Sequence, residues 1–168
     1  MRVLLIRHAK AGDRIPGGRD LYRPLVDEGR RRAGELADLL SDRPIVAVLS
    51  SPATRCVQTV EPLAARLGLT IDEQPDLFEG SATAHVLSLL ERPTITAPDA
   101  SHGAGGEVVV CTHGDVIPAV IEMVAEAGAT VRGRGCETGS IWLLERCGSG
   151  WERAIYFDRS RFDLPPTG

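Results

Sequence analysis

The chain has 168 residues, of which 43% are hydrophobic and 25% are charged. These proportions are typical of a globular protein with one core, and they exclude a disordered or membrane-embedded chain. The net charge of −4 disfavours binding to nucleic acid polymers and to anionic membranes, because the overall field repels both. A site for a phosphorylated ligand would therefore have to be a local cluster of basic side chains.

The cysteines and the N-terminus indicate a cytoplasmic protein. Four cysteines occur without a Cys-x-x-Cys pair or the spacing of a metal site, so we expect reduced thiols. Cys56 follows Arg55, which could lower its pKa, but a buried inert thiol is the preferred interpretation. The apolar run that opens the chain ends at Arg7, too early for a signal peptide or a membrane span. Without internal repeats or a break in composition, residues 1–168 are predicted to form a single domain.

Strands and helices are predicted to alternate. Short aliphatic runs are typical of strands covered on both faces, and apolar residues every three or four positions indicate helices. In chain order we expect a strand at 3–6, a helix at 27–40, a strand at 45–49, a helix from 52 to about 67, a strand at 69–71, a helix at 83–91, a strand at 108–111, a helix at 116–127 and strands at 140–144 and 151–157. This alternation predicts an α/β protein, a three-layer sandwich whose mostly parallel sheet is covered by helices on both faces.

Prolines, glycines and small polar residues mark the boundaries between these elements. Residues 50–52, Ser-Ser-Pro, are expected to cap the second helix and to supply its first-turn proline. Pro62 should kink that helix and Gly68 should end it. Residues 9–25 are rich in glycine, proline and charge, which predicts a surface loop, and residues 92–106 have the composition of a mobile loop.

Basic and imidazole side chains follow three of the predicted strands. Arg7 and His8 come after the first strand, Arg55 lies one helical turn after the second, and His113 follows the strand at 108–111. In parallel sheets the loops at the carboxyl ends of the strands converge to bind ligands. The planar fork of arginine binds two phosphate oxygens at once, and histidine can act as a nucleophile or as a donor to a charged oxygen. The sequence therefore predicts a phosphoryl pocket at this edge of the sheet.

These residues lie in motifs that resemble those of the histidine phosphatase, or phosphoglycerate mutase-like, superfamily. Arg7-His8-Ala9 resembles its Arg-His-Gly signature with alanine in the place of glycine. Residues 50–59 resemble its Ser-Pro-x-x-Arg-x-x-Gln-Thr segment, and Thr112-His113-Gly114 resembles its second histidine block. The resemblance covers nearly the whole chain and implies a phosphoric monoester hydrolase that needs no metal or other cofactor and forms a phosphohistidine on His8.

The resemblance also implies catalytic roles. His8 would be the nucleophile, and Arg7, Arg55 and His113 would surround the phosphoryl group, where fixed positive donors stabilise the transition state in place of a metal. Glu79 corresponds to the general acid that protonates the leaving oxygen.

Further polar residues near these motifs are assigned to the substrate or to the surface. Lys10 and Arg14 lie just beyond the nucleophile, and Thr112 precedes the second histidine, so we expect all three to bind substrate. His85 falls on a predicted helix and His102 in the predicted mobile loop, which favours surface positions for both.

Two branches of the superfamily remain open. Residues 7–12 and 20–25 are similar to the small phosphohistidine phosphatases of the SixA type. Residues 111–118 and 137–140 are similar to the histidine phosphatase domain that follows a Nudix domain in MutT-like proteins, although this chain has no Nudix signature. The partner is therefore expected to be a phosphorylated small molecule, such as a nucleotide, or a phosphohistidine protein. The sequence makes no prediction about oligomeric state.

A phospho-ligand binding module without catalysis and a phosphoglycerate mutase-type phosphotransferase are the alternatives. Binding alone would need only arginines and backbone donors, so the presence of His8 argues against the first. The chain lacks room for the long insertions of the mutase branch, which argues against the second.

Overall fold

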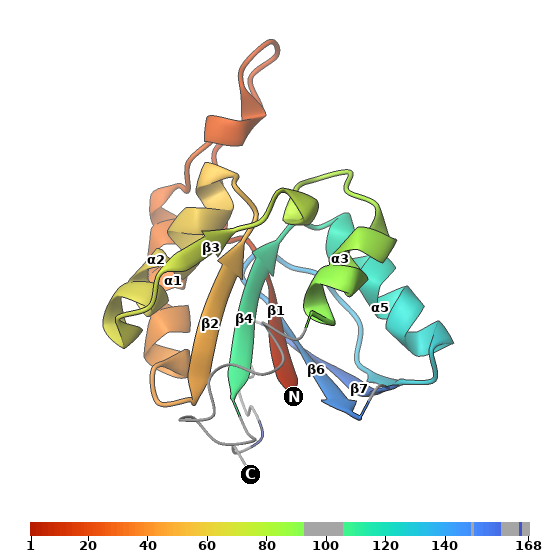
Figure 1. Ribbon diagram of the computed structural model, residues 1–168. Coiled ribbons are helices and arrows are strands. Elements are labelled where there is room, and N and C mark those ends of the chain that lie inside the picture. Colours follow the sequence, from red (N-terminus) through yellow and green to blue (C-terminus); the bar gives the residue numbers. More distant parts are fainter. Residues whose placement is uncertain (93–105, 149, 159–164, 166–168) are drawn as a thin grey trace.

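A seven-stranded mixed sheet forms the centre of the computed structural model, which describes residues 1–92, 106–148, 150–158 and 165. The strand order is β3-β2-β4-β1-β6-β7-β5 (Figure 1). The strands are β1 (Arg2–Arg7), β2 (Ile45–Ser50), β3 (Ile71–Glu73), β4 (Glu107–Thr112), β5 (Thr130–Arg132), β6 (Ile141–Cys147) and β7 (Gly150–Phe157). β3, β2, β4 and β1 run parallel, whereas β6 is antiparallel to both β1 and β7. β5 pairs in parallel with β7 at the far edge.

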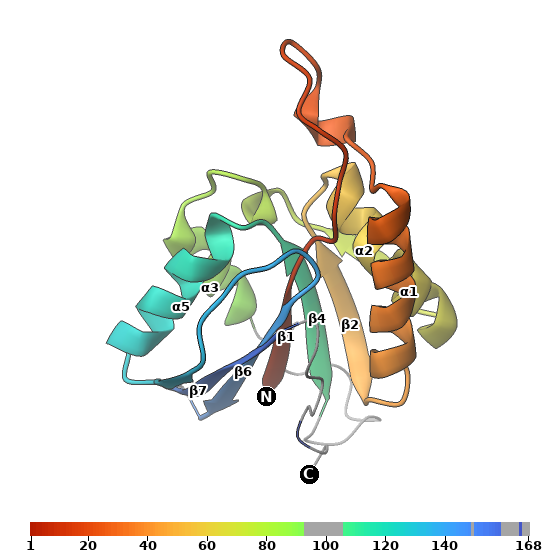
Figure 2. The same ribbon diagram turned by 180° about the vertical axis from the view of Figure 1, so that it is seen from behind.

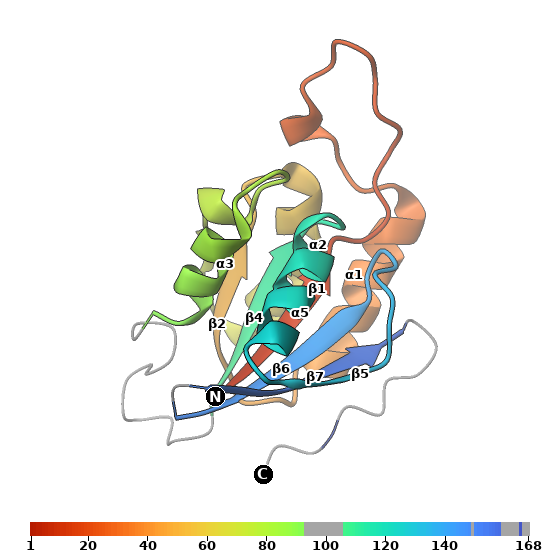
Figure 3. The same ribbon diagram turned by 90° about the vertical axis from the view of Figure 1, so that its right-hand side faces the viewer.

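Helices cover both faces of this sheet, so the predicted three-layer α/β fold is confirmed. α1 (Asp27–Leu40) and α2 (Thr54–Leu67) pack together on one face (Figure 2). α3 (Thr83–Leu90) and α5 (Val116–Glu126) lie on the other face (Figure 3). Two single-turn 3-10 helices, η1 (Asp20–Tyr22) and η2 (Pro75–Leu77), stand in the connections. No helix in the described ranges is both long and apolar enough to span a membrane.

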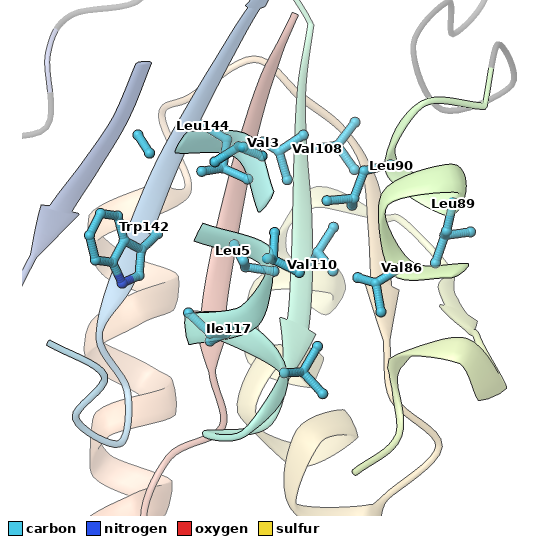
Figure 4. Close-up of a cluster of buried hydrophobic side chains, with 14 of the residues drawn as sticks. Val3, Leu5, Val86, Leu89, Leu90, Val108, Val110, Ile117, Trp142 and Leu144 are labelled. Carbon is cyan, nitrogen blue, oxygen red and sulfur yellow. The ribbon is translucent and has the colours of Figure 1, made fainter. Parts of the chain in front are cut away.

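The sheet separates two hydrophobic clusters, and the alternation of side chains along β1 explains why both exist. Val3 and Leu5 point toward α3 and α5, where they pack with Trp142 (Figure 4). Leu4 and Ile6 belong to the cluster under α1 and α2. Successive side chains of a strand point to opposite faces, so a continuous aliphatic run is the pattern of a strand buried on both sides.

Most predicted boundaries are confirmed to within a residue or two, but the predicted cap of α2 is wrong. The helix begins at Thr54 with Ala53 as its N-cap, and no side chain caps it. The Ser51 hydroxyl, expected to cap this helix, is instead 2.8 Å from Nε2 of His113. α2 continues through Pro62 and ends, as predicted, at Gly68, whose φ of 67° is left-handed.

Other features differ from the predictions or lie outside the described residues. The third strand covers Ile71–Glu73 and not 69–71, because its register follows the end of β2. β5 was not predicted, since all of its residues are exposed and no apolar pattern marks it. The predicted loop at 92–106 lies outside the described residues apart from its two end residues, and His102 lies outside them altogether. His85 is exposed on α3, as expected.

Candidate active site

The parallel strands β1, β2 and β4 place the predicted site residues at one edge of the sheet. Arg7 pairs in register with Thr112, so the residues that follow, His8 and His113, leave neighbouring strands at the same level. Their rings meet edge to face with centroids 5.4 Å apart. Arg55 reaches the same point from the first turn of α2.

His8 is held as a neutral imidazole with one nitrogen free. Its Nδ1 lies 2.8 Å from the carbonyl oxygen of Ala9, which can only accept, so Nδ1 carries the proton and Nε2 keeps its lone pair. Burial, joined by the electrostatic effects of Arg55, His113 and Arg7, outweighs the Ala9 hydrogen bond and lowers the pKa of His8 to about 3. The ring therefore stays uncharged at neutral pH, as a nucleophile requires.

Arg55 is fully buried, and its guanidinium is the positive charge that both Asp20 and Glu79 contact. Its Nη1 donates to the backbone oxygen of Asp20, 2.9 Å away. Its Nη2 lies 2.9 Å from a carboxylate oxygen of Asp20, 2.9 Å from Oε1 of Glu79 and 3.2 Å from Nδ1 of His113. On the other side of the His113 ring, Nε2 lies 2.8 Å from the Ser51 hydroxyl.

Two buried arginine nitrogens in the site lack hydrogen-bond partners. Across the described part of the chain, the buried side-chain nitrogens without a partner include Nε of Arg7 and Nε of Arg55. The guanidinium of Arg7 also donates to the carbonyl of Cys136 and lies against Gly114, where a Cβ would be 2.8 Å from its central carbon. Unpaired buried donors are costly, and an anion bound between these arginines would satisfy them.

Glu79 faces this cluster from the turn after η2. Oε1 of Glu79 lies 3.4 Å from Nδ1 of His113, in addition to its contact with Arg55, and Oε2 accepts from Arg14 at 2.5 Å. The Gly80 amide that follows donates to Asp115 at 2.8 Å, which fastens the turn to the start of α5. Glu79 thus stands where an acid could reach a leaving oxygen.

The substrate-binding candidates fall into two groups. A cavity of about 610 Å³ is lined by residues that include Lys10 and Arg14, together with Arg7, His8 and Glu79. Lys10 stands at the rim, about half exposed, and pairs with Glu28 at 2.6 Å. Thr112 does not line the cavity: its side chain is buried, and its hydroxyl donates to the carbonyl of Leu77 at 2.7 Å.

Residues outside the predicted set hold the backbone of Arg7 and His8. The amide of Gly139 donates to the carbonyls of Arg7 and His8 at 3.0 and 3.2 Å. The carbonyl of Gly139 accepts from Nε and Nη2 of Arg32, a buried arginine of α1, at 3.1 and 2.8 Å. A Cβ on Gly139 would lie 2.6 Å from the Arg32 side chain, and its φ of 76° is left-handed, so glycine is required there. Sequence reasoning missed Arg32 because an arginine in a helix usually faces water.

Two further features surround the histidines. His8, Glu79 and His113 offer donor atoms within 4.8 Å of one another, a spacing that could hold a metal ion. Arg55 contacts both Glu79 and His113, so a cation there would meet an existing positive charge and an anion fits better.

Cys56 is buried with Sγ 3.6 Å from Nε2 of His113. Its burial raises the thiol pKa, but hydrogen bonds from Cys111 and His113 and the nearby positive charges lower it to about 6.

The edge of the parallel sheet brings together two arginines and two histidines, and His8 is one histidine that stays neutral. These features define an α/β protein built to bind and attack a phosphoryl group.

Known proteins similar to this chain agree with this class. A model of the histidine phosphatase superfamily (branch 1) matches residues 3–85. The SixA protein of Agrobacterium tumefaciens is 28% identical, with a TM-score of 0.66 over 86% of this chain and 91% of that one. The SixA protein of Nakamurella multipartitia is 26% identical, with a TM-score of 0.68 over 90% and 91%. The chain belongs to the histidine phosphatase superfamily.

A curated relative with a named activity is also similar to this chain. The 8-oxo-(d)GTP phosphatase of Mycolicibacterium smegmatis is 37% identical over 145 residues, which cover 84% of this chain but 43% of that protein. The chain thus spans less than half the length of the curated relatives it matches.

Proposed function

We propose that the chain is a phosphatase that works through a phosphohistidine on Nε2 of His8. The observation that carries this proposal is the neutral His8, whose free nitrogen lies among arginines with unpaired donors. A site for binding alone would not need a buried imidazole with a lone pair kept available. Membership of the histidine phosphatase superfamily supports the same reaction.

The geometry suggests how each step would proceed. Nε2 of His8 attacks phosphorus while the bond to the leaving oxygen breaks, and Arg7, Arg55 and His113 hold the three outer oxygens as charge develops on them. Glu79 gives its proton to the leaving oxygen and then takes one from the water that attacks the phosphohistidine. Phosphate is released, and His8 is regenerated as a neutral ring. A metal is not needed in this scheme, because the arginines supply the positive charge.

Binding must rearrange the ion pairs of the free site. Asp20 and Glu79 now share Arg55, and a phosphoryl group would compete with both carboxylates for it. A phosphoryl dianion that binds Arg55 in place of these carboxylates adds negative charge beside Glu79. This charge favours protonation of the Glu79 carboxyl group. The general acid would therefore acquire its proton as substrate binds.

Trapping the intermediate tests the proposal. Single-turnover reactions with a generic aryl phosphate, quenched at several times, should yield protein-bound phosphate that is labile in acid and stable in base. The His8→Ala protein should form none and should not hydrolyse the substrate. If product forms while no phosphoprotein is trapped, water attacks directly. If neither forms and phosphate still binds, the chain is a binding module.

Two substrate classes are supported by relatives, and we favour the nucleotide. The SixA proteins are described as phosphohistidine phosphatases, and the relative with 37% identity as an 8-oxo-(d)GTP phosphatase. The second alignment has the higher identity and covers 84% of this chain. Hydrolysis rates for nucleotides, phosphohistidine peptides and sugar phosphates, measured side by side, would decide between the classes.

A further inference from the structure

The loop between β1 and α1 projects beyond the sheet edge that carries the site. We call residues 12–24 the arm; it is the dark orange loop that rises above the sheet (Figures 1 and 3). Its base is closed by a bridge between Ala11 and Leu25 and by Arg23, which donates to the carbonyl of Gly12 at 2.9 Å. The arm is therefore a loop whose base is held in place by backbone pairing and a hydrogen bond.

A second cavity lies within the arm and borders the phosphoryl pocket. Its volume is about 950 Å³, within the range of about 300–1,000 Å³ typical of ligand sites. Ile15, Pro16, Tyr22 and Pro24 contribute apolar lining, whereas Arg14 and Arg23 line this cavity and the phosphoryl pocket alike. One molecule could therefore place its phosphate against His8 and its organic part in the arm.

The apolar residues of the arm are unusually exposed. Ile15 is 75% and Tyr22 60% accessible, and they are two of the three large hydrophobic side chains that stand exposed in the described ranges. The backbone that carries Tyr22 is anchored, because η1 also contains Asp20, whose backbone oxygen accepts a hydrogen bond from the buried Arg55. Apolar surface held open beside a charged site is a mark of ligand binding.

The geometry points to the arm as the site for the base and sugar of a nucleoside phosphate. A flat aromatic ring beside arginines is the combination that stacks on nucleobases, and the arginines shared by the two cavities lie where the chain of phosphates would run. The surface of the cavity is mainly apolar, which suits the face of a base better than the polar backbone of a peptide. The inference rests on the proposed phosphatase function and names its substrate class.

The test compares two substrates of the whole protein. kcat/KM is measured for guanosine diphosphate and for phosphoramidate, which carries no organic group. Tyr22→Ala should lower the ratio of the two values about tenfold, since one stacked base contributes roughly that factor. Tyr22→Phe keeps the ring and should keep the ratio. Val131→Ala, which removes an exposed hydrophobic residue from β5 at the far edge of the sheet, is the matched control.

The outcomes separate the two proposals. Phosphoramidate turnover that is lost in His8→Ala supports the phosphatase whatever happens at the arm. An unchanged ratio in Tyr22→Ala, or an equal loss on both substrates, overturns the arm as a nucleoside site. A phosphohistidine peptide serves as a third substrate: a loss confined to it in Tyr22→Ala, with guanosine diphosphate unaffected, also overturns the proposal and assigns the arm to peptide substrates.

Discussion

Burial keeps His8 uncharged and also makes this residue destabilising to the fold in acid. The ring is 6% exposed and is surrounded by Arg7, Arg55 and His113, so a proton on it would be both desolvated and repelled. The features that keep Nε2 free for attack on phosphorus thus oppose protonation of the folded protein. The proposed catalysis and the expected acid sensitivity therefore have the same physical origin at this residue.

The pH dependence of stability should report this directly. The folded pKa of His8 is about 3, against 6.5 ordinarily, so between these values the unfolded chain binds a proton that the folded chain does not. The free energy of unfolding should therefore fall as pH drops from 6.5 toward 3, by up to roughly 3 kcal/mol at pH 4 from this residue. Urea denaturation at pH 7, 5 and 4 should show a smaller fall for His8→Gln than for wild type. Parallel curves would refute the neutral ring.

Arg55 and Lys10 are both cations near the cavity, but they should differ in importance. Arg55 is fully buried within the site, whereas Lys10 is half exposed and paired with Glu28. A donor that strengthens as transition-state charge develops contributes about a hundredfold to turnover, so Arg55→Ala should lose on that order and Lys10→Ala far less. Steady-state kcat measures both, and a thermal melt checks that Arg55→Ala is folded. Equal turnover in Arg55→Ala and wild type would remove Arg55 from the mechanism.

At the scale of elements, β4 and the start of α5 control the turn that carries Glu79. The hydroxyl of Thr112 at the end of β4 binds the carbonyl of Leu77, and the carboxylate of Asp115 binds the amide of Gly80. The acid is thereby fixed from both sides to the elements that also deliver His113. Thr112, expected to bind substrate, is better placed to position Glu79.

Loosening this turn should mimic a partial loss of the acid. Asp115→Ala removes the acceptor of the Gly80 amide, so Glu79 would reach the leaving oxygen less often. An alkyl phosphate has a poor leaving group and needs that proton more than an aryl phosphate does. We expect kcat to fall about tenfold on the alkyl ester, less than the roughly hundredfold or more that a complete loss of acid catalysis costs, and much less on the aryl ester. Glu79→Gln sets the upper limit of this selectivity, and equal losses on both esters would show that the turn does not position an acid.

The elements that sequence reasoning placed well are those with a strong local pattern. The helix at 27–40 could be predicted because one apolar stripe along it is buried. The central strands could be predicted because both of their faces are buried, which gives continuous aliphatic runs. β5 carries no such pattern, since Thr130–Arg132 is exposed and owes its conformation to pairing with β7. The cap of α2 was predicted wrongly for a related reason: Ser51 is 62 residues from His113 in sequence, and local capping rules do not include such a partner.

The sequence could predict which site residues lie together where strands position them, but not where loops do. The residues that follow strand ends, namely Arg7, His8, Arg55 and His113, could be grouped because parallel strands end at one edge. Asp20 could not, since its contact with Arg55 depends on how the arm folds back across 35 residues. Arg14 was expected near the substrate, but its pairing with Glu79 was not. Contacts set by loops carry little signal in a single sequence.

At the scale of the whole molecule, the strand order makes the two halves of the chain inseparable. The family model covers residues 3–85, which include β2, β3 and all of β1 except Arg2. β1 and β2 do not touch in the sheet, however, because β4 lies between them and pairs with both. A fragment that contains only the matched region lacks its central strand.

Such a fragment should fail to fold. A chain that ends at Leu90 would leave β1 unpaired on both sides and β2 unpaired on one, and it would lose Val108 and Val110 from the core. We expect no cooperative thermal transition in its circular dichroism, whereas the full chain should show one. A cooperative transition in the fragment would mean that β1 and β2 can pair directly.

The position of β4 also governs how the protein can fold while it is being synthesised. Translation proceeds from the N-terminus, so β1 and β2 leave the ribosome well before Glu107–Thr112 exists to join them. During that interval their aliphatic side chains, Leu4 and Leu49 among them, have no sheet in which to be buried. The nascent first half is therefore the stage at which the chain is most open to aggregation and to capture by chaperones, and release from that stage comes with the arrival of β4, the strand that also carries Thr112 and leads to His113.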